Sequence, residues 1–120
     1  MEKVTLVLGA SLKPERYSNK AVHALVSNNH DVLAFGLRNG NIGRVEIQKN
    51  LPLRIPIDTV TLYLNPSRQK EYYRYLIDLK PRRVIFNPGT ENSELVTLLE
   101  QEGIITEVAC TLVLLSIGNY

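Results

Sequence analysis

A single cysteine stands among the 120 residues, and no apolar run approaches the length of a membrane span. One cysteine cannot form an internal disulfide, and a zinc site would lack its thiolate ligands. Apolar runs such as 4–8 and 112–117 fall far short of the ~20 residues that a transmembrane helix needs. We therefore expect no structural metal site and no membrane-embedded protein.

A strong excess of charge is also lacking, because 14 Lys and Arg residues face 12 Asp and Glu residues. The basic residues are scattered among acids, so no nucleic-acid partner is predicted. With 44% hydrophobic and 22% charged residues, the composition is typical of a globular protein. The length leaves room for one core, so residues 1–120 are expected to form a single domain. The N-terminal residues show no secretory signal, which predicts a cytoplasmic protein.

Short apolar runs alternate with helical patterns along the chain. Strands are predicted at 4–8, 31–35, 59–64, 83–86 and 104–107, and helices from Ser18, from Pro66, over 91–101 and over 110–117. Ser18 and Asn19 are the predicted N-caps of the first helix. A further short strand is predicted at 45–48, reached by an extended loop because a parallel crossover usually needs a longer connection. This alternation is typical of an α/β protein with a parallel sheet and helices on both faces.

Four strand ends carry residues that are typical of ligand-binding turns. They are Gly9–Ser11, Arg38–Gly40, Tyr63–Pro66 and Asn87–Thr90. In open parallel sheets, ligands bind beyond the carboxyl ends of the strands. Gly9 leaves room for a phosphate, and Lys13 and Arg16 can add charge beside the start of the first helix. Taken alone, each turn could simply be the exit of a strand, because Asn, Pro and Gly are common in turns. Taken alone, Arg38 could simply be a solvated surface charge. Their combination favours a binding site.

The first turn does not carry the complete dinucleotide-binding pattern. That pattern needs glycines where Ser11 and Pro14 stand, and it needs an acid near the end of the second strand. Arg38 occupies that region instead and suits a phosphorylated ribose. Plain NAD is therefore disfavoured, whereas NADP and coenzyme A both remain open.

Five segments form a specific set: Val7–Ser11 with Pro14, Arg16–Ala21, Leu62–Pro66, Val84–Glu91 and Ala109–Thr111. This set resembles the stand-alone CoA-binding domain family, small relatives of the N-terminal domain of the succinyl-CoA synthetase alpha subunit. The resemblance spans nearly the whole chain. It implies a three-layer Rossmann-like domain whose mostly parallel sheet has five to six strands in the order 3-2-1-4-5-6. It also implies that coenzyme A or an acyl-CoA is the ligand.

The resemblance assigns roles to each strand end. It implies that the loop from Gly9 to Arg16 and the helix start at Ser18 hold the pyrophosphate, and that Arg38 lies near the phosphorylated ribose. Tyr63 to Asn65 would line the pantetheine or adenine side. The family commonly has Asn-Pro and a basic residue where this chain has 36–38. The predicted cofactor-binding residues are Gly9, Ala10, Ser11, Lys13, Arg16, Ser18, Asn19, Arg38, Tyr63, Leu64, Asn65, Asn87, Pro88 and Gly89.

No complete catalytic constellation is present in the sequence. His23 falls within the first helix, and His30 falls at the end of the sheet opposite the expected site. Cys110 has two interpretations, a small buried side chain or a reactive thiol that exchanges with the thiol of coenzyme A. The chain has no room for the additional ligase domains of the synthetase relatives, so an acyl-CoA ligase is not expected and a non-enzymatic module is favoured.

Three functions therefore remain open. The first is a non-enzymatic CoA-binding carrier, sensor or regulatory module. The second is an NADP-binding redox sensor or oxidoreductase-like module. The third is an interaction protein in which Tyr72, Tyr73 and Tyr75 form a homodimer surface or meet an unidentified protein partner.

Overall fold

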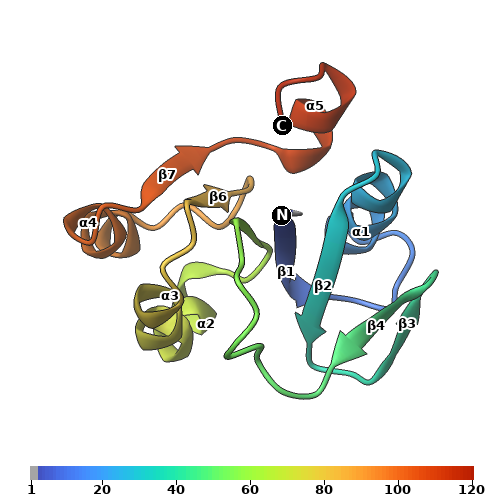
Figure 1. Ribbon diagram of the computed structural model, residues 1–120, viewed down its shortest axis with the longest axis horizontal. Helices are drawn as coiled ribbons and strands as arrows, with labels where there is room; N and C mark the ends of the chain where they lie inside the picture. Colours follow the sequence, from blue (N-terminus) through green and yellow to red (C-terminus); the bar gives the residue numbers. More distant parts are fainter. Residues whose placement is uncertain (1–2) are drawn as a thin grey trace.

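A central sheet with helices on both faces forms the body of the computed structural model, which describes residues 3–120 (Figure 1). The elements in chain order are β1 (Val4–Ala10), α1 (Tyr17–Ser27), β2 (Asp31–Gly36), β3 (Gly40–Ile42), β4 (Val45–Gln48), β5 (Thr59–Leu62), α2 (Pro66–Gln69), the 3-10 helix η1 (Lys70–Tyr72), α3 (Tyr73–Leu79), β6 (Arg83–Phe86), α4 (Ser93–Gln101), β7 (Ile105–Val108) and α5 (Thr111–Ser116). None of the helices between residues 3 and 120 is long and apolar enough to cross a membrane.

The sheet has seven strands in the order β3-β4-β2-β1-β5-β6-β7. Every neighbouring pair is parallel except β3 and β4. Without β3, this order is the predicted 3-2-1-4-5-6, so the Rossmann-like α/β fold is confirmed. The expected number of five to six strands was one too low, because β3 was not predicted.

The added strand explains how β4 is reached from β2. Residues Gly40–Ile42 and Val45–Gln48 form an antiparallel hairpin, with Ile42 opposite Val45 across a two-residue turn. Gly43 has φ +59° in that turn, a conformation that tight hairpin turns require and glycine adopts readily. A hairpin therefore takes the place of the extended loop that was expected before β4.

Both faces of the sheet are buried. On β1, Leu6 and Leu8 point into a core that includes Leu76 of α3 and Leu95 of α4. Val7 points to the opposite face, into the core that α1 and α5 cover. Helices α3 and α4 thus lie on one side of the sheet, and α1 and α5 lie on the other (Figure 1). This two-sided burial explains why β1 reads as a continuous apolar run.

The start of α1 differs from the prediction. Its N-cap is Arg16, which makes no side-chain capping hydrogen bond, and Ser18 and Asn19 lie buried inside the first turn. The Asn19 side chain instead donates from Nδ2 to the Ser11 carbonyl oxygen at 2.8 Å. The prediction of Ser18 and Asn19 as N-caps was therefore wrong. Because Asn19 binds back to the preceding loop, it holds that loop against the helix.

Candidate functional site

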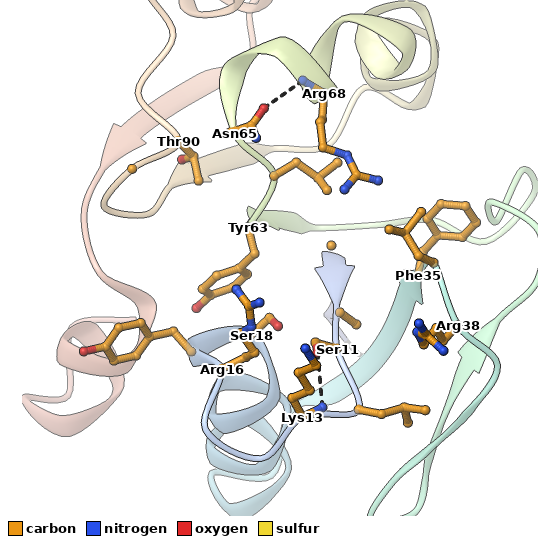
Figure 2. A pocket seen from close by; sticks show the side chains of 18 of the residues that line it. Ser11, Lys13, Arg16, Ser18, Phe35, Arg38, Tyr63, Asn65, Arg68 and Thr90 are labelled. Atoms are coloured by element: carbon orange, nitrogen blue, oxygen red, sulfur yellow. Dashed lines mark hydrogen bonds between the residues drawn. The ribbon is translucent and has the colours of Figure 1, made fainter.

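A cavity of about 530 Å³ opens at the carboxyl ends of the strands. It lies where β1, β2, β5 and β6 leave the sheet, with β1 at its centre (Figure 2). Its lining residues are Gly9, Ala10, Ser11, Leu12, Lys13, Arg16, Tyr17, Ser18, Phe35, Gly36, Leu37, Arg38, Tyr63, Leu64, Asn65, Arg68, Tyr72, Pro88, Gly89 and Thr90. The four strand ends singled out in the sequence therefore border one shared space.

The exit of β1 depends on a close approach between backbones. Gly9 has φ +101°, and a Cβ atom placed there would lie 3.1 Å from the Tyr63 carbonyl carbon and 3.1 Å from Leu64 Cγ. A larger residue would push the β1 exit away from the β5 exit. Gly9 therefore allows the loop to Arg16 to run along the floor of the cavity.

The positive end of α1 faces the cavity without a protein partner. No side chain caps this helix, and its first turn contains no acidic residue. Arg16, Tyr17 and Ser18, which begin the helix, all line the cavity. The amide groups of a first turn carry partial positive charge, which suits an anion.

Four cations line the cavity: Lys13, Arg16, Arg38 and Arg68. All four side chains are exposed, and none of them forms a salt bridge within residues 3–120. No Asp or Glu belongs to the described lining. The cavity therefore carries a concentrated positive charge that attracts anionic ligands.

The β2 exit forms a partly aromatic wall. Phe35 and Tyr72 meet edge to face with their ring centroids 6.0 Å apart, and both line the cavity beside Leu37. Gly36 lies directly against β1, because a Cβ atom added to it would overlap the Ala10 carbonyl oxygen. This contact holds the exits of β1 and β2 close together.

Asn87 has a different environment from that expected of a ligand contact. Its buried side chain donates from Nδ2 to Thr61 Oγ1 at 2.6 Å and to the Leu62 carbonyl at 2.9 Å. Its Oδ1 accepts from the Thr111 amide at 2.8 Å. Asn87 therefore joins β5, β6 and the start of α5, and these bonds position the adjoining turn.

The turn that follows β6 satisfies most of its own polar groups. The Gly89 amide donates to Glu91 Oε1 at 2.9 Å, and the Thr90 amide donates to the Asn87 carbonyl at 2.9 Å. Pro88, Gly89 and Thr90 line the cavity but bring no charge to it. This side of the cavity therefore has no charged lining residue, and its Gly89 amide already has an acidic partner.

Tyr63 lines the cavity, and its hydroxyl group is buried. The Oη atom has no hydrogen-bond partner among the described residues. Burial raises the pKa of the Tyr63 phenol to about 12, because the phenolate would be poorly solvated there. The hydroxyl group therefore stays protonated, and able to donate, throughout the physiological pH range.

Most of the predicted site residues line the cavity. The exceptions are Asn19 and Asn87, which are buried and bind protein groups instead. Leu12 and Thr90 also line the cavity and belong to segments that the sequence had singled out, although neither was among the predicted cofactor-binding residues. Six further lining residues were missed: Tyr17, Phe35, Gly36, Leu37, Arg68 and Tyr72. A signal for Arg68 was present, since it follows the predicted helix start at Asn65-Pro66 by less than one turn.

The candidate reactive groups lie apart from the lining. Cys110 is partly buried at the N-cap of α5, and His23 is exposed on α1. His30 packs edge-on against Tyr120, with ring centroids 4.8 Å apart. Within residues 3–120 no cluster of three His, Cys, Asp or Glu residues is arranged to hold a metal ion.

The three tyrosines around η1 and α3 are all partly buried against the core. Tyr73 donates to Glu94 at 2.9 Å, and Tyr75 donates to the Pro52 carbonyl at 2.7 Å. The hydroxyl groups of Tyr73 and Tyr75 thus bind groups of the same chain. A homodimer surface at this helix stays a prediction.

Comparisons with known proteins agree with the fold. A family model described as a CoA binding domain matches residues 3–116. A crystal structure of an uncharacterized protein is 43% identical, with a TM-score of 0.95 over 100% of this chain and 99% of that one. A hypothetical protein from Pyrococcus horikoshii OT3 is 30% identical, with a TM-score of 0.76 over 90% of this chain and 75% of that one. A protein from Thermus thermophilus, 23% identical, shares the fold with a TM-score of 0.86 over 99% of this chain and 91% of that one. No match was found among curated proteins.

Proposed function

The chain belongs to the CoA-binding domain family, and from this premise we propose that its cavity binds coenzyme A or an acyl-CoA. The family membership supports CoA binding in general. The lining residues support the particular cavity at the carboxyl ends of the strands. We further propose that residues 1–120 act as one cytoplasmic domain.

The single observation that carries the proposal is the positive charge of the cavity. Four unpaired cations surround the uncapped start of α1, and the described lining contains no acid. Like charges gathered in this way repel one another, and an anion that binds among them offsets this repulsion. Coenzyme A brings two separate anionic groups, a diphosphate and a ribose phosphate, and so matches a cavity with several separated cations.

The arrangement suggests how the ligand lies. We assign the diphosphate to the start of α1, with Lys13 and Arg16 beside it, because amide groups and cations converge there. Arg38 at the β2 exit is assigned to the ribose phosphate. The pantetheine arm then runs along Tyr63 and the neutral turn after β6. These assignments are proposals for each residue.

A non-catalytic role fits the lining best. The described lining contains no Asp, Glu, His or Cys, the side chains that most often transfer protons or attack a thioester. We therefore propose a carrier, sensor or regulatory module rather than an enzyme. The competing function, an NADP-binding redox module, is favoured by Arg38 alone, since a 2′-phosphate also suits that side chain.

Thermal unfolding with added ligands tests the proposal. A ligand that binds only the native state raises the unfolding midpoint, so coenzyme A and acetyl-CoA should raise it and NADH should not. Arg16→Ala should reduce the shift. Arg74→Ala is the matched control, because Arg74 is exposed on α3 and pairs with Asp78 away from the cavity. A shift with NADPH and none with coenzyme A would overturn the proposal and favour the redox module.

A further inference from the structure

We propose that Arg68 on α2 binds the ribose phosphate of the ligand together with Arg38, and thereby makes the protein selective for ligands with that phosphate. This inference rests on the proposed function and adds a specificity-determining residue to it. The two arginines come from different strand exits, β5 and β2, and both line the same cavity.

The backbone that carries Arg68 is firmly held. Its amide donates to Asn65 Oδ1 at 3.0 Å and lies 3.0 Å from the Asn65 carbonyl oxygen. The next residue, Gln69, is buried, and its Nε2 donates to the carbonyl oxygens of Leu64 and Thr90 at 2.8 Å each. Asn92 in turn donates to Gln69 Oε1 at 2.9 Å. The short helix is thus fixed against both the β5 and β6 exits, so Arg68 starts from a defined position.

The side chain of Arg68 extends from this anchored turn toward the cavity (Figure 2). Three arginines have acidic partners: Arg74 pairs with Asp78, Arg82 with Asp58 and Arg83 with Glu107. Arg68 forms no such pair within residues 3–120. Its guanidinium group therefore keeps all of its side-chain hydrogen-bond donors for a ligand.

Arg38 lines the same cavity from the β2 exit. Figure 2 shows Arg68 and Arg38 on opposite sides of Phe35, while Arg16 lies at the start of α1. Two guanidinium groups that flank Phe35, in a described lining without an acid, fit a second anion separate from the one at α1. A phosphate monoester has three terminal oxygens and can accept from both arginines, whose planar donors suit phosphate.

The edge-to-face pair of Phe35 and Tyr72 adds an apolar wall at this end of the cavity. A nucleoside phosphate has the matching composition, with a flat base for the aromatic wall and a phosphate for the arginines. The adenosine end of the ligand is therefore assigned to the space between α2 and the β2 exit.

Calorimetric titration with coenzyme A and with 3′-dephospho-coenzyme A tests this inference. The wild-type protein should bind coenzyme A more tightly than the dephosphorylated ligand by about tenfold to a hundredfold, the effect of losing charge-assisted hydrogen bonds. Arg68→Ala should weaken coenzyme A binding by about tenfold and leave 3′-dephospho-coenzyme A unaffected. Arg68→Lys, which keeps the charge but loses the planar donors, should fall between. Arg74→Ala should bind both ligands as the wild type does.

The possible failures are distinguishable. If the wild-type protein binds both ligands and Arg68→Ala weakens both equally, Arg68 contacts another part of the ligand and the inference is wrong, while the proposed function stands. If the wild-type protein binds neither ligand, the proposed function and this inference fall together. Because Arg68 is exposed, its variants should unfold at the wild-type temperature, which the same samples can show by calorimetric scanning.

Discussion

Replacing Gly36 with alanine tests the geometry of the cavity most directly. The added Cβ atom would overlap the Ala10 carbonyl oxygen, which belongs to the backbone of the neighbouring strand. A flexible side chain could rotate away, but a strand backbone cannot. The exits of β1 and β2 must therefore separate, and both of them line the cavity.

Overpacking of this kind costs roughly 1–3 kcal/mol, and a rigid obstacle places Gly36→Ala near the upper limit. For a domain of this size, we expect the unfolding midpoint to fall by roughly 10 °C. The affinity for coenzyme A should fall as well, because Ala10 and Gly36 move apart at the floor of the cavity. Calorimetric scanning and titration measure the two effects on the same protein.

Gly103→Ala supplies the control. Gly103 has φ +77°, and an added Cβ atom would meet no atom within 4 Å. It lies before β7, at the opposite end of the sheet from the cavity. This variant should lose about 1 kcal/mol from backbone strain and keep its affinity for coenzyme A. If Gly36→Ala were as stable as the wild type and bound coenzyme A equally well, the described contact between β1 and β2 would be refuted.

Three further measurements test other parts of the structure. Asn87→Ala removes three buried hydrogen bonds and should lower the free energy of unfolding in urea by about 3 kcal/mol, whereas the exposed Asn50→Ala should change it by less than about 0.5 kcal/mol; equal losses would contradict the network. Hydrogen bonding to Arg82 lowers the pKa of Asp58, so this pair stabilises the protein above the unfolded-state pKa of Asp58 and loses that effect as the pH falls through the folded-state value. Arg82→Ala should cost about 1 kcal/mol at neutral pH and little in acid, and a pH-independent loss would argue against the ion pair. The affinity for coenzyme A should fall about tenfold as salt rises from roughly 0.05 to 0.5 M, and a salt-independent affinity would contradict the role of the four cations.

The fold was predictable because nearly every strand is buried on both faces or bounded by a clear turn. Runs such as 4–8 and 83–86 form β1 and β6 within a residue or two of their predicted limits. Strand β3 gave no such signal. Its three residues, Gly-Asn-Ile, have low strand propensity apart from Ile42, and they are extended because β4 pairs with them. A strand that forms only because a neighbouring strand pairs with it cannot be predicted from its own residues.

The location of the cavity was predictable, because it follows from the arrangement of the parallel strands. Once parallel strands are assumed, the residues that leave them must share one edge, and this reasoning found the loop from Gly9 to Arg16 and also Arg38. It did not separate residues that face the ligand from residues that face the protein. Asn87 and Pro88 both follow β6, yet the Asn87 side chain binds Thr61 and the Thr111 amide whereas Pro88 lines the cavity. The difference depends on which backbone groups need a partner after folding.

The turn after β6, whose residues carry no charge, has a consequence for how a ligand is oriented in the cavity. Because Gly89 and Thr90 already use their amides within the protein, that wall can hold an uncharged chain but has little to offer a phosphate. The two ends of the cavity therefore differ, because one end attracts anions and the other does not. An elongated molecule with a charged group at one terminus would bind in a single orientation. We expect the cavity to recognise the charged part of its ligand and to tolerate variation in the uncharged group at the other end.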